Sequence, residues 1–175
     1  MDARVHHLQG KAEFVTELIT LLQEFYRDKL TMMLRHAAAA RVVPQYDANN
    51  AYQYIINREE TQLSWIAKAI EELGGSARDG ADGGRTIAGK GAQAAHAAIE
   101  EDARDAQAFV DRWRPRVDAM AHARHAKMLR VVIGEVLEAK RFFEQALAGR
   151  TDLLGRRAAT LEPASGQVLP ERWIE

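Results

Sequence analysis

A glutamate lies in the middle of a long amphipathic pattern of this sequence. Apolar residues recur there at steps of three and four, which predicts one buried face of a long helix. Glu59 falls in the centre of that face, where an unpaired carboxylate costs several kcal/mol. The side chain therefore needs a cation, a proton or a metal ion. The apolar members of the face are Tyr52, Ile55, Ile56, Leu63, Ile66 and Ile70.

A second glutamate has the same setting later in the chain. Glu135 falls in the centre of another stripe with helical spacing. Its apolar members are Met128, Val131, Val132, Ala139, Phe142 and Ala146. The main functional signal of this sequence is a pair of glutamates, each expected on the buried face of a long helix.

The composition favours a single helical domain. The chain has 175 residues, of which 47% are apolar, and alanine is abundant. A chain of this length can bury a substantial core. Cysteine is absent, which excludes disulfides, thiolate metal sites and cysteine nucleophiles.

The charge pattern argues against nucleic-acid and membrane partners. The 24 basic and 25 acidic residues give a formal net charge of −1, so the chain lacks the basic footprint of a nucleic-acid-binding protein. It has no run of 18 apolar residues that would predict a membrane span. Its first residues are too polar for a secretion signal. We therefore expect a soluble cytoplasmic protein.

Proline and glycine divide the chain into four expected helices. Pro44 ends the first helix, and Gly74 and Gly75 end the second. Pro115 fits the first turn of the fourth helix, which ends at Gly149. The expected helices cover residues 11–40, 47–73, 92–113 and 115–147.

The link between the second and third helices is the long one. Residues 74–91 contain seven glycines but no GxxxxGK[ST] or GxGxxG phosphate-binding pattern, so we expect a plain crossover. The predicted fold is an all-α, up-down-down-up four-helix bundle, whose crossover makes the second and third helices parallel. Residues 1–149 form this bundle. Residues 150–175 are expected to be an extended tail, with Trp173 and Ile174 as anchors on the bundle or on a partner subunit.

The two halves of the chain can be superposed at a shift of 76 residues. Glu59 then falls on Glu135 and Gln62 falls on Glu138. By the same shift Glu24 matches Glu100 in the preceding helices. Spacing of three residues places both members of a pair on one helical face. Oxygen ligands of this kind suit iron or manganese.

With these features the chain resembles the ferritin-like superfamily, which includes ferritins, bacterioferritins and rubrerythrins. The resemblance covers about residues 10–148 and is strongest at residues 58–75, which begin REETQLSWI. It implies a non-haem di-iron or dimanganese carboxylate site, oxygen or peroxide chemistry, and a homodimer or larger homo-oligomer. The implied metal ligands are Glu24, Glu59, Gln62, Glu100, Glu135 and Glu138, with Glu59 and Glu135 in the bridging positions.

The chain departs from the pattern of that superfamily at several positions. Gln62 and Glu138 stand where histidine is usual in the Glu-x-x-His motif. Tyr26 and Asp102 also obey the shift of 76 and lie nearer the expected core than Glu24 and Glu100. Among the six histidines, His96 is the one expected to approach the centre.

A metal-free protein is the alternative interpretation. Lys29 falls inside the stripe of the first helix, and Arg124 lies on the expected inner face of the fourth. These cations could pair with Glu59 and Glu135, because buried ion pairs persist where the geometry is good. The chain would then be a structural or interaction bundle.

Overall fold

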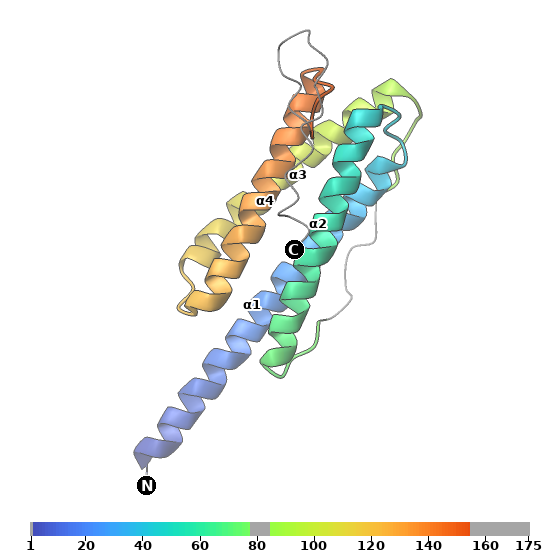
Figure 1. Ribbon diagram of the computed structural model, residues 1–175. Helices are drawn as coiled ribbons and strands as arrows, with labels where there is room; N and C mark the ends of the chain where they lie inside the picture. Colours follow the sequence, from blue (N-terminus) through green and yellow to red (C-terminus); the bar gives the residue numbers. More distant parts are fainter. Residues whose placement is uncertain (1, 78–84, 155–175) are drawn as a thin grey trace, which may run out of the picture.

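The computed structural model describes residues 2–77 and 85–154, and side chains from Glu13 onward. This part of the chain forms four α-helices and no strand (Figure 1). The predicted all-α four-helix bundle is therefore confirmed. Residues 155–175 of the predicted tail (residues 150–175) lie outside the described residues. The helices are α1 (Asp2–Ala40), α2 (Tyr46–Glu72), α3 (Ala92–Asp118) and α4 (Ala123–Leu147).

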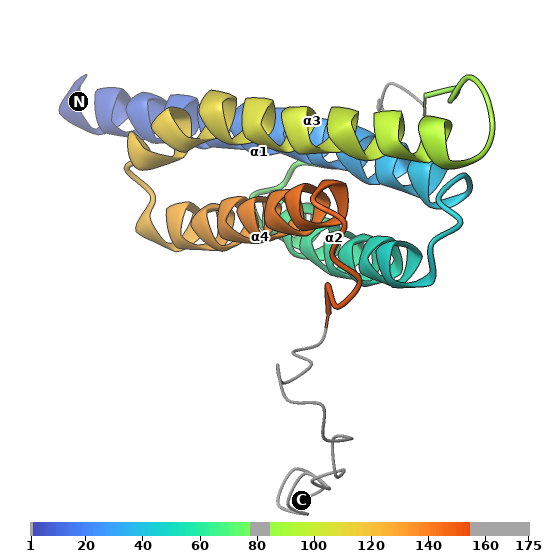
Figure 2. The same cartoon turned by 90° about the horizontal axis from the view of Figure 1, so that it is seen from above.

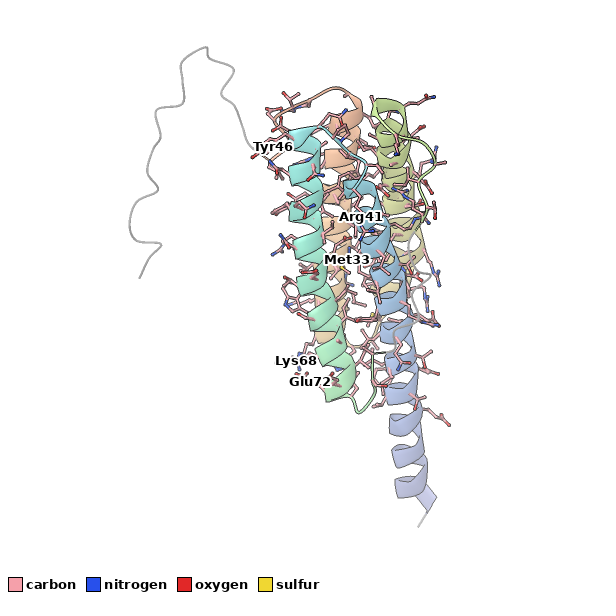
Figure 3. The ribbon with its side chains drawn as sticks, turned by 90° about the vertical axis from the view of Figure 1, so that its right-hand side faces the viewer. Met33, Arg41, Tyr46, Lys68 and Glu72 are labelled. Atoms are coloured by element: carbon pink, nitrogen blue, oxygen red, sulfur yellow. The ribbon has the colours of Figure 1, made fainter. Side chains whose placement is uncertain are left out.

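The helices run up, down, down and up. α1 rises through Met33 and Arg41, and α2 returns from Tyr46 to Glu72 (Figure 3). The crossover returns the chain to the end of the bundle where α2 begins, so α3 runs parallel to α2 (Figure 1). α1 and α3 lie on one side of the bundle, with α2 and α4 on the other (Figure 2). The closest packing joins α1 to α2 and α3 to α4.

A polar layer divides the apolar core into two clusters. One cluster gathers around Phe25 and Trp113, which are both fully buried and pack edge to face with ring centroids 4.8 Å apart. The other gathers around Tyr52 and Phe143, whose ring centroids are 5.2 Å apart. Between the clusters, α1 and α2 place buried polar side chains along their inner faces. These are Lys29, His36, Glu59 and Gln62.

The boundary between the last two helices differs from the prediction. α3 continues through Pro115 to Asp118, and α4 begins only at Ala123. Pro115 lacks an N–H group, but it lies on the exposed side of α3, where the carbonyl group left without that donor is open to solvent. Continuing the helix lets Trp113 and Val117, one turn apart, both enter the core. Burial of these two side chains outweighs the helix-breaking preference of one proline.

Candidate buried polar site

The candidate site is centred on Glu59, which is 2% exposed. Its Oε1 accepts a hydrogen bond from Lys29 Nζ at 2.5 Å, and its Oε2 lies 2.9 Å from His36 Nδ1. Lys29 and His36 are each 1% exposed. They are two turns apart on α1 and so face α2 from the same side. Both carboxylate oxygens of Glu59 are therefore engaged.

The electrostatic surroundings favour the ionised form of Glu59. Burial alone raises the pKa of this carboxyl, because a buried charge loses its hydration. The nearby His36 and Lys29 act in the opposite direction, and the net pKa lies below its ordinary value. Glu59 is thus held as a carboxylate inside the core.

Glu135 on α4 is half-buried rather than buried. Its Oε2 accepts a hydrogen bond from Gln62 Nε2 at 2.5 Å and another from Arg58 Nε at 2.9 Å. Arg58 also pairs with the second carboxylate oxygen. Val131, expected on the inner face with Glu135, is instead 51% exposed. Leu129 and Ile133 fill the core in its place.

A small cavity of about 20 Å³ separates the two glutamates. Lys29, Glu59, Gln62 and Glu135 border it, and Tyr54 and Phe142 stand at its outer side. The Oε1 atom of Gln62 is buried and has no hydrogen-bond partner among the described residues. A space of this size holds one water molecule. A water there would satisfy the Gln62 oxygen.

The structure brings together only part of the expected ligand set. Glu59, Gln62 and Glu135 border the same cavity, and the exposed Glu138 lies at its rim. Glu24 instead pairs with Arg116 at 2.8 Å, towards the α1–α3 surface. No group of three or more His, Cys, Asp or Glu side chains within residues 13–77 and 85–154 is arranged to hold a metal ion.

Glu100 and the alternative ligands also lie away from Glu59. Glu100 is exposed and lies 3.4 Å from Arg104 on the same helix. His96, expected to approach the centre, is exposed on α3. Tyr26 is only partly buried, against the cluster around Phe25. Asp102 is fully buried but belongs to a second polar group.

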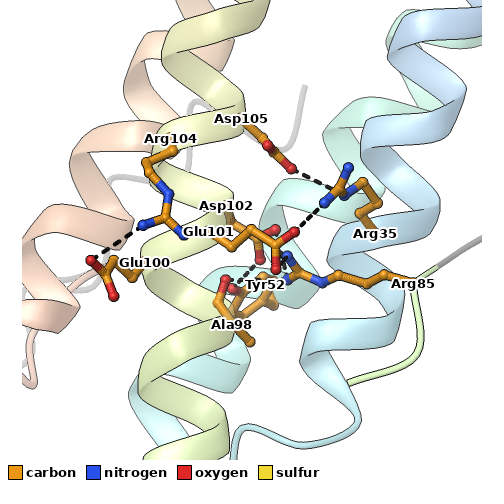
Figure 4. Close-up of polar contacts among 9 residues, drawn as sticks. All are labelled: Arg35, Tyr52, Arg85, Ala98, Glu100, Glu101, Asp102, Arg104 and Asp105. Atoms are coloured by element: carbon orange, nitrogen blue, oxygen red, sulfur yellow. Dashed lines mark hydrogen bonds and ion pairs between the residues drawn. The ribbon is translucent and has the colours of Figure 1, made fainter. Parts of the chain in front are cut away.

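That second group fastens the crossover to the bundle (Figure 4). Asp102 Oδ2 accepts a hydrogen bond from the Tyr52 hydroxyl at 2.5 Å. Its Oδ1 lies 2.8 Å from Arg85, whose guanidinium also pairs with Glu101 at 2.9 Å. Burial raises the pKa of Asp102, although His36, Tyr52 and Arg85 act to lower it. Burial and the adjacent Asp102 carboxyl likewise raise the pKa of Tyr52.

The sequence interpretation missed two partners of the glutamates and misassigned a third. His36 was not expected at the site, although it follows Lys29 by seven residues and thus shares its helical face. Arg58 was not expected as the partner of Glu135. Arg124, proposed as such a partner, is exposed and pairs with Glu72 at 3.1 Å.

Comparisons with protein-family models, with curated proteins and with solved structures found no match. The resemblance to the ferritin-like superfamily therefore stays a prediction, as do the metal, the compartment and the oligomeric state. None of the helices in the described part combines the length and apolar character needed to span a bilayer. The function must be argued from the geometry of the bundle.

Proposed function

We propose that this chain is a metal-independent interaction bundle in which Glu59 and Glu135 have structural roles. One observation carries the proposal: the ammonium group of Lys29 lies 2.5 Å from Glu59, and both side chains are almost fully buried. A lysine there supplies the positive charge that a metal ion would supply beside a buried carboxylate. The ion pair accounts for the carboxylate without any further ligand.

The donor set around the cavity does not fit two metal ions in this arrangement. Glu59 already accepts from Lys29 and faces His36, and Glu135 already accepts from Arg58 and Gln62. Two divalent ions beside the Lys29 ammonium would also meet strong repulsion in a medium of low dielectric. The Gln62 oxygen is the one orphaned oxygen at this cavity, and one water is enough to satisfy it.

The volumes and positions of the hollows favour a protein that binds partners at its surface over an enzyme that encloses a substrate beside Glu59. The cavity beside Glu59 holds about 20 Å³, whereas sites for small molecules enclose roughly 300–1,000 Å³. The larger hollows lie on the surface, and one of about 540 Å³ is lined by Tyr54, Phe142 and residues that follow α4. Exposed aromatic side chains such as Tyr54 and Trp65 are typical of binding surfaces.

The direct test is the metal content of the full chain. The protein would be purified from medium supplemented with iron and manganese, titrated with Fe²⁺ and Mn²⁺ without oxygen, and measured by elemental analysis and calorimetry. We expect substoichiometric metal and no saturable binding. About two metal ions per chain, the content of a ferritin-like dimetal site, absent from a Glu59→Ala/Glu135→Ala control, would overturn the proposal.

A designed variant provides the matched positive control. Lys29→Glu with Gln62→His adds a carboxylate from α1 and an imidazole from α2 to the cavity that Glu59 and Glu135 border. These are the ligand types found in ferritin-like dimetal sites. We expect this variant to bind Fe²⁺ or Mn²⁺ measurably more tightly than the wild type. Equal stoichiometric binding by both proteins would contradict a role for Lys29 in place of a metal.

A further inference from the structure

Three hollows follow one another along the seam between α2 and α4. A hollow of about 540 Å³ lies at one end, beside Tyr54 and Phe142. The cavity at Arg58 and Glu138 follows, and a hollow of about 210 Å³ beside Trp65 and Met128 lies at the other end. We call these three hollows together the α2–α4 furrow. It lies where two neighbouring helices pack less closely than α1 with α2 or α3 with α4.

The furrow displays apolar side chains in a row. Tyr54 and Trp65 are 41% and 38% exposed and are eleven residues apart, so they lie on the same face of α2 about three turns from each other. On α4, Met128 lines the hollow beside Trp65. At the wide end, the Tyr54 and Phe142 rings meet edge to face, with centroids 6.1 Å apart. Such a row suits an extended segment with apolar anchors.

The chain itself arrives at the wide end of this furrow. Leu153 is buried in the core cluster around Tyr52, and Leu154, 48% exposed, is the last described residue. Both line the 540 Å³ hollow. The end of the described chain lies on the α2–α4 side of the bundle, away from α1 and α3 (Figure 2). Whatever follows Leu154 in sequence starts beside the furrow.

We propose that residues 168–174 of the same chain bind along the α2–α4 furrow. This segment, VLPERWI, combines four apolar side chains with one acidic and one basic residue. Trp173 is the largest of them, and tryptophan is a frequent anchor in a well-packed hollow. The furrow offers both signs of charge beside its apolar row, including Lys68, Glu72, Glu138 and Arg141.

The length of the chain allows this placement. The furrow extends from Phe142 to Met128, fourteen residues of α4 and hence about 21 Å. Residues 155–167 can span up to about 43 Å when extended. Tethering also gives the segment a high effective concentration at the furrow. A weak contact is therefore enough to keep the segment bound.

Disulfide trapping in the full chain tests this placement, because the native chain has no cysteine. One variant carries Glu138→Cys in the furrow with Glu171→Cys. The matched control carries Glu144→Cys with Glu171→Cys. Glu144 is 53% exposed on α4 and pairs with Lys140 outside the furrow. It is closer in sequence to the tether, so tethering alone would favour the control.

Rates of intramolecular disulfide formation would be followed by mass spectrometry and by non-reducing electrophoresis. They would be normalised to the maleimide reactivity of each single-cysteine variant. We expect the furrow pair to close about tenfold faster than the control pair, and Trp173→Ala in the furrow pair to remove most of this advantage. Equal rates, a faster control, no effect of Trp173→Ala, or crosslinked dimers as the main product would each overturn the proposal. This result does not depend on the metal content of the protein.

Discussion

Lys29 of α1 and Glu59 of α2 form an ion pair with 2.5 Å between Nζ and Oε1, and both side chains are almost fully buried. His36 completes the pair from the second side of the carboxylate. A buried pair of this kind adds little stability compared with apolar residues of similar size, but removal of one partner leaves a charge stranded. The stability lost on removing one partner and the stability after replacing both partners by apolar residues can be measured separately.

Lys29→Met removes the cation and retains most of the side-chain volume. We expect the free energy of unfolding to fall by about 3–5 kcal/mol, because Glu59 keeps only His36 as a partner. Urea unfolding followed by circular dichroism measures this loss. The double variant Lys29→Met/Glu59→Leu should recover most of it. If Lys29→Met alone is as stable as the wild type, Lys29 does not compensate the buried charge of Glu59.

Glu59 should make the free energy of unfolding decrease as the pH falls. The folded pKa of Glu59 lies below its ordinary value because His36 and Lys29 outweigh burial, whereas in the unfolded chain the carboxyl titrates at about 4.3. The stabilisation is therefore complete above the unfolded pKa and is lost as the pH falls through the folded pKa. Unfolding measured from pH 6 to pH 3 should show a weaker acid loss for Glu59→Gln. Parallel curves for both proteins would contradict this.

Arg85 should matter most when Asp102 is ionised. It lies 2.8 Å from the fully buried Asp102 and lowers the pKa that burial raises. We expect Arg85→Met to cost about 3 kcal/mol at pH 7, and less as the pH falls, since protonation neutralises Asp102. Asp102→Asn in the same chain should restore much of the loss. Hydrogen exchange at residues 85–91 should rise in Arg85→Met alone.

His125 should titrate below the ordinary histidine range. Burial lowers its pKa first, and then His122 and Arg124 add repulsion. The two Nδ1 atoms of His122 and His125 are 2.8 Å apart. Proton NMR titration of His122→Ala should show a higher pKa for His125 than in the wild type, because one repelling neighbour is gone. An unchanged or lower pKa would contradict a repulsive effect of His122 on His125.

The helical pattern of the sequence was enough to predict the bundle, the crossover and the burial of Glu59 and Lys29. Each of these depends on the period of a single helix or on the position of glycine and proline. Val131 and Val132 show what the helical pattern cannot predict. They are adjacent and both apolar, and the rotation of α4 against its neighbours decides that Val132 is buried and Val131 exposed.

The partners of the charged groups could not be predicted in the same way. Arg58 belongs to the more exposed side of α2, and its long side chain turns towards Glu135 on another helix. Arg85 lies in the crossover, and its contacts with Glu101 and Asp102 exist only after the helices have assembled. The repeat that matched Glu24 with Glu100 compares positions along helices, but it carries no information on which neighbour each residue faces.

The polar layer between the two apolar clusters also has a consequence for the alignment of the helices. Apolar side chains would tolerate a slip of α1 past α2 by one turn, about 5.4 Å, since leucine and phenylalanine have no directional partners. The same slip would separate Lys29 and His36 from Glu59 and strand three polar groups at once. We infer that this polar layer fixes the axial register of α1 against α2. A variant with an all-apolar layer should then be at least as stable as the wild type, but its NMR signals should be broadened because several helix registers coexist.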